Sequence, residues 1–336
     1  MKNNPARPMA VLGAGSFGTA LALHLAREGQ PVRLWAHEED SIIAMQNERV
    51  NTRYMPGFPF PETLAPIVSL EETVSGIRDI LVVVPSIAFR DVLIRLKPHL
   101  AVDTRIVWAT KGLDAKTGQL LHDVAMEVLG HARAYAVISG PSFAREVAAA
   151  LPTAVVAASS DPVFAEDLVA RFNHPPFRVY SSSDVTGVET GGVVKNVLAI
   201  ATGISDGMQF GANARSALIT RGLAEMMRFG VALGGQPETF MGLAGIGDLV
   251  LTCTDNQSRN RRFGLALGLG KSVSDAGQEI GQVVEGRRNA PLIMKLAQQH
   301  GVEMPIVEAV CAILNGTLTP VEAMYQLLSR EPGTEY

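Results

Sequence analysis

Short, continuously apolar segments recur through the first half of this 336-residue chain, separated by stretches with helical periodicity. A strand that is apolar at every position is covered on both faces, as in a parallel sheet with helices on each side. The alternation therefore predicts an α/β domain built on a doubly wound, mainly parallel sheet. The strand-like runs are 9–13, 31–35, 79–84, 105–109, 134–139, 153–158 and 177–182, and the helical stretches between them include 18–28, 88–96, 119–129 and 162–172.

The second half of the chain has a different pattern. After about Ser183 the strand-like runs end and Ala, Leu, Met and Gly dominate, which predicts an all-α domain. We place the boundary so that the α/β domain covers residues 1–188 and the helical domain residues 189–336. Within the first half, the proline-rich segment 54–66 predicts a surface loop. Helices of the second half are expected at about 189–205, 213–234, 239–250, 258–268, 272–280, 289–299, 305–315 and 319–329.

Three glycines follow the first strand-like run and open a helical stretch. Gly13, Gly15 and Gly18 form GxGxxG in the strand–turn–helix context that binds a dinucleotide. Gly13 permits a tight turn, Gly15 lets a pyrophosphate approach the backbone, and Gly18 lets helix and strand pack closely. Ser16 and Phe17 lie in the first helical turn, whose free N–H groups attract phosphates. The alternative is a glycine-rich turn that holds no ligand.

The end of the second strand indicates which nicotinamide coenzyme fits. An acid about 20 residues past the turn is typical of NAD binding, and Glu38 has that spacing. We expect His37 to be the polar residue at the strand end, with Arg33 nearby. A strand end that is cationic or neutral tolerates a 2′-phosphate. The sequence therefore favours NADP, with NAD also accepted. Alternatively, residues 37–39 only begin the next helix.

Polar residues also follow two later strands. Ligands of open parallel sheets bind beyond the carboxyl ends of the strands. Lys111 follows one such strand, and Gly140 and Ser142 follow the next. We expect Ser142 to be a helix N-cap, and capping alone is the alternative to a binding role. Lys111 is otherwise an exposed loop residue.

Lys195 is the only charged residue between Glu189 and Asp206. Burying an unpaired ammonium costs several kcal/mol, so such a group is paired, hydrated or deprotonated. Snorkelling of the side chain to the surface is the alternative to a functional role. Asp206 lies about 16 Å farther along the same helix and is a poor partner for Lys195.

A second charged segment lies at residues 247–264. Asp248 precedes an apolar helix start, and Ser258, Arg259 and Asn260 begin the sequence SRNRR. Arginine and hydroxyl groups at a helix start suit a phosphate, although a solvated basic face has the same pattern. Cys253 has no histidine within 40 residues on either side, so we predict a plain packing residue.

The overall composition excludes several classes of protein. The formal net charge of −4 provides no basic field for nucleic acid or an anionic membrane. No apolar run is long enough to span a bilayer, and the start of the chain lacks a signal-peptide pattern. The cysteines, Cys253 and Cys311, have no metal-binding or disulfide spacing, and the histidines are scattered. We therefore expect a soluble cytoplasmic protein without a metal site.

Several segments together resemble the bacterial NAD(P)-dependent glycerol-3-phosphate dehydrogenases. They appear in the order of that family and span roughly residues 10 to 310. The resemblance implies a Rossmann domain followed by a helical domain, and a homodimer. It also implies reduction of dihydroxyacetone phosphate to sn-glycerol 3-phosphate for phospholipid synthesis. The segments are GAGSFGTALA, WATKGL, ISGPSFAREVA, GGVVKNVLAIATGISDG, FGANARSALITRGLAEM, TFMGLAGIGDLVLTCT, SRNRRFG and GQVVEG.

The same resemblance assigns roles to individual positions. Lys195 matches the general acid/base of the family. The positions assigned to the coenzyme on this resemblance are Ser16, Phe17, His37, Lys111, Ala144, Arg259, Val283 and Glu285. The positions that match substrate contacts are Lys111, Gly140, Ser142, Lys195, Asp248, Ser258, Arg259 and Asn260.

This assignment predicts a mechanism in which Lys195 protonates the ketone oxygen as hydride arrives from the nicotinamide. We expect its apolar helix to lower the pKa of Lys195 and to direct the amine into a cleft between the domains. Asp248 either balances the ammonium or holds a substrate hydroxyl, and Asn196 orients Lys195 or the substrate. Two alternatives remain open: a reductase of a ketopantoate-like or 3-hydroxy acid, and a non-catalytic module that senses nicotinamide coenzymes.

Overall fold

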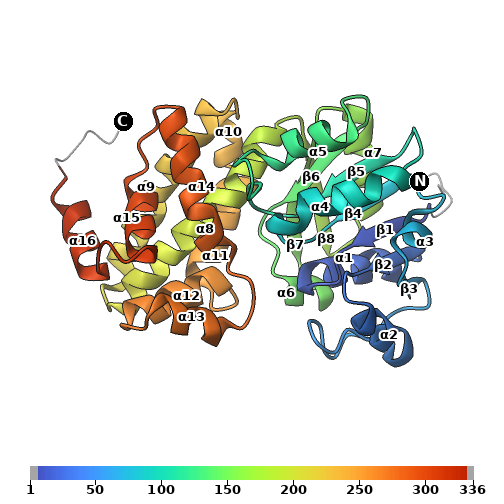
Figure 1. The fold of residues 1–336 in the computed structure, drawn as a ribbon, viewed down its shortest axis with the longest axis horizontal. Helices are drawn as coiled ribbons and strands as arrows, with labels where there is room; N and C mark the ends of the chain where they lie inside the picture. The colour runs from blue at the N-terminus through green and yellow to red at the C-terminus, as the bar shows by residue number, and fades with distance from the viewer. Residues whose placement is uncertain (1–6, 331–336) are drawn as a thin grey trace. The chain divides into compact units, whose positions relative to one another are not determined.

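The computed structural model describes residues 7–330, which form two compact units (Figure 1). The first unit contains the chain up to Asp114 together with Gln119–Glu189. The second unit contains Ala115–Gly118 and the chain from Thr190 onward. The chain therefore enters the second unit briefly after the fifth strand before it completes the first.

The first unit is built on an eight-stranded sheet with the order β3-β2-β1-β4-β5-β6-β7-β8. Neighbouring strands are parallel except for β6 and β7, which pair antiparallel. The predicted mainly parallel, doubly wound sheet is confirmed. The strands are β1 (Met9–Leu12), β2 (Val32–Trp35), β3 (Leu64–Pro66), β4 (Asp79–Val82), β5 (Arg105–Trp108), β6 (Tyr135–Ser139), β7 (Thr153–Ser159) and β8 (Phe177–Ser182).

Strand β3 lies inside the segment 54–66, where the prolines predicted only a loop. That prediction is wrong for these residues, because Leu64, Ala65 and Pro66 pair in parallel with β2. Proline cannot donate a ladder hydrogen bond, but an edge strand needs partners on one side only. Pro66 is the last residue of such an edge strand, so the ladder tolerates it.

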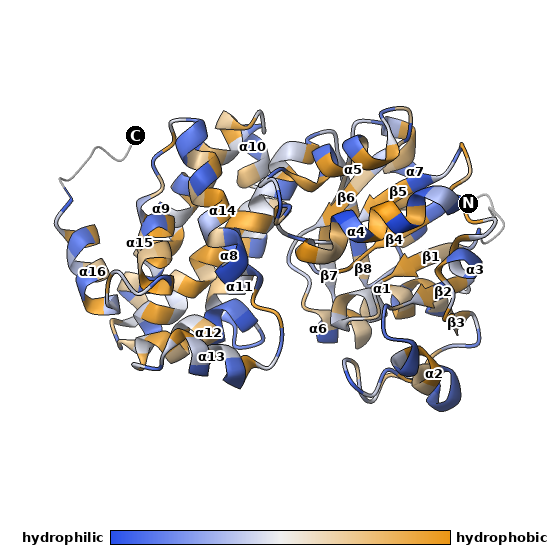
Figure 2. Ribbon diagram, in the orientation of Figure 1, coloured by the Kyte–Doolittle hydropathy of each residue, from blue (hydrophilic) through white to orange (hydrophobic). Residues whose placement is uncertain are grey.

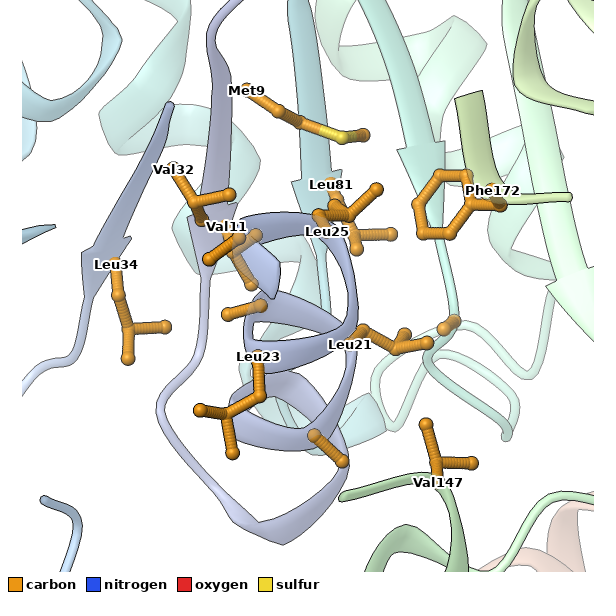
Figure 3. Packing of buried hydrophobic residues seen from close by; sticks show 14 of the residues in the cluster. Met9, Val11, Leu21, Leu23, Leu25, Val32, Leu34, Leu81, Val147 and Phe172 are labelled. Atoms are coloured by element: carbon orange, nitrogen blue, oxygen red, sulfur yellow. The ribbon is translucent and has the colours of Figure 1, made fainter. Parts of the chain in front are cut away.

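Helices cover the sheet on both faces and close its apolar core. Figure 3 shows Leu21 and Leu25 of the first helix beside Val11 of β1 and Leu81 of β4, with Phe172 packed next to them. All of these side chains are fully buried. The helices of this unit are α1 (Ser16–Arg27), α2 (Glu39–Glu48), α3 (Leu70–Val74), α4 (Ser86–Leu96), α5 (Leu121–Leu129), α6 (Ala144–Ala148) and α7 (Pro162–Phe172).

The second unit is helical, as the sequence predicts. Its first helix, α8, is the longest and begins in the first unit before continuing into the second. The helices are α8 (Val185–Gly207), α9 (Gly211–Ala232), α10 (Pro237–Phe240), α11 (Asp248–Thr254), α12 (Arg259–Gly268), α13 (Val273–Ile280), α14 (Glu285–Gln299), α15 (Pro305–Leu314) and α16 (Pro320–Leu328).

The helix expected at 239–250 is broken in the structure. Helix α10 ends at Phe240, a π-helical turn spans Leu243–Gly247, and α11 begins at Asp248. The break depends on close backbone contact, because a Cβ atom on Gly245 would collide with the backbone of Phe240. As a result, Asp248 lies in the first turn of a separate helix.

Glycines, among them Gly203 and Gly264, bring the backbones of α8 and α12 into direct contact. A Cβ atom on Gly203 would meet the carbonyl oxygen of Arg261, and one on Gly264 would meet the carbonyl oxygen of Ile200. Side chains at these positions would force the helices apart. The two glycines therefore hold the start of α12 at a fixed position relative to α8, the helix that carries Lys195.

Apolar and polar residues are distributed as expected for packed units surrounded by water. Figure 2 shows mostly hydrophobic strands and hydrophilic residues along the outer helices. Within residues 7–330, no helix is both long and apolar enough to cross a membrane.

Candidate active site

The glycine-rich turn connects β1 to α1. Gly13 has a φ of +120°, and its N–H donates to the carbonyl oxygen of Trp35, 2.8 Å away. A Cβ atom on Gly13 would collide with the carbonyl of Val83, and one on Gly18 would collide with the carbonyl of Gly13. These two glycines are therefore required by the backbone itself.

Gly15 differs from its two neighbours in the motif. A Cβ atom on Gly15 would meet no heavy atom within 4 Å, so open space lies in front of this residue. Gly15 is also the N-cap residue of α1, directly before the first helical residue, Ser16. Open space beside the N–H groups of a helix start fits a pyrophosphate. The turn is thus compatible with a dinucleotide.

A neighbouring loop fixes this turn in place. Asn51 donates to the carbonyl oxygen of Ala14 at 2.8 Å, and Ser16 Oγ donates to the carbonyl oxygen of Tyr54 at 3.3 Å. Phe17 is half-buried and packs against the apolar core. Asn51 was not predicted from the sequence, because nothing near it marks a residue that supports a turn 37 positions away.

His37 lies exposed just after the end of β2, as expected. Arg33, however, is not its neighbour, because the Arg33 guanidinium donates to the carbonyl oxygens of Glu72 and Ser75, both at 2.8 Å. Arg95 of α4 lies there instead, with Nη1 3.5 Å from His37 Nδ1. No local pattern indicates this contact, because the two residues are 58 positions apart. Helix α2 begins at Glu39.

The residues after β5 and β6 meet at one carbonyl group. Lys111 Nζ lies 3.4 Å from the carbonyl oxygen of Gly140, and Ser142 Oγ donates to the same oxygen at 2.9 Å. The prediction that Ser142 caps a helix is wrong. Helix α6 begins at Ala144, and its N-cap residue is Phe143. The Ser142 hydroxyl stabilises the turn instead.

Lys195 of α8 is buried, and its ammonium group binds two side chains of α11. Nζ lies 2.5 Å from Asp248 Oδ1 and donates to Thr252 Oγ1 at 2.9 Å. Lys195 and Asp248 are 7% and 1% exposed, so the side chain does not snorkel to solvent. Of the two roles expected for Asp248, the structure shows the balancing of the ammonium, because its carboxylate contacts Lys195 Nζ directly. The sequence separation of 53 residues hides this contact.

Thr252 belongs to this cluster although we did not predict it. It lies four residues after Asp248, so the two side chains share one face of α11. Its hydroxyl also contacts the Asp248 carbonyl oxygen at 2.6 Å. The four-residue spacing within a helix is the signal that could have revealed it. Cys253 beside it is fully buried, and burial raises the pKa of its thiol to about 12, so it is inert near neutral pH.

The start of α12 separates its arginines. Ser258 is the N-cap, and its hydroxyl accepts from the N–H of Arg261 at 3.2 Å. Arg261 turns inward and pairs with Asp206. Arg259 is exposed, and its guanidinium donates to Gln282 Oε1 at 3.2 Å. Only part of this basic segment therefore faces solvent.

Asn260 connects three helices. Its amide nitrogen donates to Asn196 Oδ1 on α8, and its oxygen accepts from the N–H of Gly286 on α14, both at 2.9 Å. Asn196 thus binds Asn260 and not Lys195. Val283 lies just before α14, and Glu285 is its first residue. This bridge fixes the Val283–Glu285 segment next to the helix that carries Lys195.

No group of side chains within residues 7–330 has the composition of a metal site.

Two family models cover most of the chain. The model of the NAD-dependent glycerol-3-phosphate dehydrogenase N-terminus matches residues 8–165, and that of the C-terminus matches residues 184–325. The chain belongs to this dehydrogenase family. Its members include proteins that are similar over nearly their full length.

Glycerol-3-phosphate dehydrogenase [NAD(P)+] of Serratia proteamaculans is 58% identical over 323 residues, which is 96% of this chain and 95% of that protein. The enzyme of the same name from Yersinia pestis is 58% identical over 331 residues, covering 98% and 97%. The crystal structure of glycerol-3-phosphate dehydrogenase from Coxiella burnetii has a TM-score of 0.94 at 56% identity, covering 96% of this chain and 99% of that one.

Proposed function

We propose that this protein reduces dihydroxyacetone phosphate to sn-glycerol 3-phosphate with NADPH or NADH, reversibly, and that it thereby supplies glycerophospholipid synthesis. Membership of the dehydrogenase family supports the reaction. The observation that carries the chemistry is the buried hydrogen bond between Lys195 and Asp248. A buried amine with a fixed carboxylate partner is suited to donate and recover a proton.

Lys195 is the general acid of the proposed reduction. When bound, NAD(P)H supplies the hydride, and negative charge develops on the ketone oxygen. Lys195 donates a proton to that oxygen, and in the reverse direction its neutral amine removes the proton of the hydroxyl group. Asp248 stabilises the ammonium form, and Thr252 fixes the direction in which the amine points.

We assign the substrate phosphate to the start of α12. The exposed guanidinium of Arg259 offers several N–H donors, which suit a phosphate. The amide nitrogen of Asn260 carries two protons, of which one goes to Asn196. The residues assigned to the substrate are Lys111, Gly140, Ser142, Lys195, Asp248, Ser258, Arg259 and Asn260.

The coenzyme is assigned mainly to the glycine-rich turn, where the open space at Gly15 supports a pyrophosphate. In this division residues 1–188 provide most of the dinucleotide site, while residues 189–336 provide most of the substrate site and carry catalysis. The residues assigned to the coenzyme are Gly13, Gly15, Ser16, Phe17, Gly18, His37, Lys111, Ala144, Arg259, Val283 and Glu285.

The reaction is tested by following NADPH and NADH oxidation with dihydroxyacetone phosphate and with unphosphorylated dihydroxyacetone. We expect turnover only with the phosphorylated ketone. Equal rates with both ketones would refute the phosphate site, and coenzyme binding without oxidation would favour a sensing module. A ketopantoate-like acid that is reduced faster would favour the other reductase.

Lys195→Ala tests the proton donor directly. It should remove most turnover while coenzyme binding persists, and near-normal kcat would refute the role of Lys195. Lys295→Ala is the matched control, because Lys295 is an exposed lysine on α14. Its turnover should equal that of the unmodified protein.

The protein is further proposed to be a homodimer of the cytoplasm. Cys253 and Cys311 are both free thiols, which supports a reducing compartment. Light scattering coupled to size-exclusion chromatography measures the oligomeric state. A mass of one chain would refute the dimer.

A further inference from the structure

Arg95 lies close to the end of β2 although it comes from α4. Its Nη1 is 3.5 Å from His37 Nδ1, and its guanidinium carbon lies 5.2 Å from the centre of the Trp35 ring. An arginine over an aromatic face is attracted by the ring and loses part of its freedom. The guanidinium is therefore held near the strand end and does not extend freely into solvent.

The ring under Arg95 is itself fixed. Trp35 is 2% exposed, and its Nε1 donates to the carbonyl oxygen of Val68 at 3.0 Å. Its carbonyl oxygen accepts from the N–H of Gly13, the first glycine of the GxGxxG turn. Arg95 is thus positioned by a residue that directly contacts the proposed pyrophosphate turn.

Neighbouring arginines have structural partners that Arg95 does not share. Arg90 on the same helix pairs with Asp114 and Glu127, and Arg33 binds backbone carbonyls. Among the described residues 7–330, no carboxylate forms an ion pair with Arg95. A guanidinium carries five N–H donors, and the exposed guanidinium of Arg95 can offer them to an anion at this strand end.

We propose that Arg95, with His37, binds the 2′-phosphate of NADP(H) and sets the coenzyme preference of this protein. The inference rests on the proposed dehydrogenase function for the presence of a nicotinamide coenzyme. In dinucleotide folds the end of the second strand lies at the adenosine ribose, where an arginine accommodates a 2′-phosphate. Arg95 supplies that arginine from another helix, so a motif search along β2 would miss it.

Glu38 has the opposite effect in this proposal. It is exposed at the start of α2, and an acid at this position accepts the 2′-hydroxyl of NADH. Its charge also repels a 2′-phosphate. Arg95 and Glu38 together therefore predict a protein that accepts both coenzymes and binds NADPH more tightly.

The test measures binding to the full chain without substrate, so its outcome does not depend on turnover. Dissociation constants of NADPH and NADH are measured by coenzyme fluorescence, and those of 2′,5′-ADP and 5′-AMP by calorimetry. Arg95→Met retains a long apolar side chain over Trp35 but removes the charge. This variant should bind NADPH and 2′,5′-ADP roughly ten- to a hundredfold more weakly than the unmodified protein. Its affinity for NADH and 5′-AMP should change less than about twofold.

Two further variants complete the test. Lys97→Ala removes an exposed charge that follows α4 directly and should leave the NADPH-to-NADH ratio unchanged. Glu38→Gln should raise the preference for NADPH. An unchanged ratio in Arg95→Met would overturn the proposal, and so would equal weakening of all four ligands. Retained binding of 5′-AMP shows that the variant is folded.

Discussion

Asp248 Oδ1 lies 2.5 Å from Lys195 Nζ, and both side chains are buried. The pair joins α11 to α8. It places a negatively charged carboxylate beside the amine, in surroundings that are otherwise mostly apolar. Removing one member of a buried pair leaves an uncompensated charge, which costs more than the pair contributes. The relationship therefore has consequences for stability and for the pH dependence of turnover.

Asp248→Asn should lower the free energy of unfolding by about 3 kcal/mol at neutral pH, because it leaves the ammonium without a counter-charge. The same change disfavours the protonated amine, so the loss of reductase activity at high pH should begin at lower pH. Urea unfolding and the pH profile of kcat/KM measure the two effects.

The control for this change is Glu279→Gln. Glu279 pairs with Lys271 at 2.6 Å on the surface, where both side chains are about half-exposed. An exposed pair contributes less than about 1 kcal/mol. Equal destabilisation by Asp248→Asn and Glu279→Gln would contradict the importance of the buried pair.

Thr252 should affect turnover through Lys195. Thr252→Val removes the hydroxyl that accepts from Lys195 Nζ, so kcat should fall about tenfold while KM stays within about twofold. Thr252→Ser keeps the hydroxyl and should restore most of kcat. A valine variant with unchanged kcat, or a serine variant as slow as valine, would show that Thr252 only packs.

Glu225 should make stability depend on pH. Burial raises the pKa of Glu225 to about 7, although the N–H groups of Ile306 and Val307 at the start of α15 donate to its carboxylate. A pKa raised in the folded state means that folding favours the protonated form. This contribution to the free energy of unfolding amounts to about 3 kcal/mol. It is fully present below about pH 4.5 and is lost as the pH rises to about 7.

Glu225→Gln isolates this effect because it keeps an acceptor for α15 and cannot ionise. The stability of Glu225→Gln relative to the unmodified protein should increase between pH 5 and pH 8, as measured by urea unfolding at both values. A constant difference across this range would show that Glu225 does not titrate there.

Gly264 should tolerate no side chain. In Gly264→Ala the new Cβ atom would meet the carbonyl oxygen of Ile200, which belongs to a backbone that cannot move away cheaply. We expect a loss of about 2 kcal/mol in unfolding free energy. Gly277→Ala on α13 is the matched control, since its Cβ would meet only the end of the Arg287 side chain. Alanine forms helices better than glycine does, so this control should not unfold at a lower temperature than the unmodified protein.

The sequence predicts best what depends on local patterning. Continuous apolar runs identified strands such as Met9–Leu12 because burial on both faces leaves a local signature. The same runs carry no direction, so the antiparallel pairing of β7 with β6 was not predictable. Leu64–Pro66 was missed because the four prolines of the segment 54–66 outweigh a strand signal only three residues long.

Many residues of the site could be predicted individually from the sequence, but the contacts between them could not. Lys195 was recognisable as a lone charge in an apolar helix, whereas its partner Asp248 comes from another helix. Ser258 was selected for its position at a helix start, and its hydroxyl caps α12. Arg95 was not selected at all, because only the folded chain brings α4 to the end of β2.

The glycine-rich turn offers a prediction that separates binding from folding. Gly15→Ala should leave thermal stability unchanged, because its Cβ atom would meet no heavy atom within 4 Å. It should lower the affinity for NADPH and for NADH equally, by more than about tenfold, because the methyl group occupies space that the pyrophosphate needs. Gly18→Ala should instead destabilise the fold, since its Cβ atom would collide with the carbonyl oxygen of Gly13. Fluorescence titration and thermal unfolding of both variants measure the contrast. If Gly15→Ala binds both coenzymes normally, the pyrophosphate does not lie at this turn.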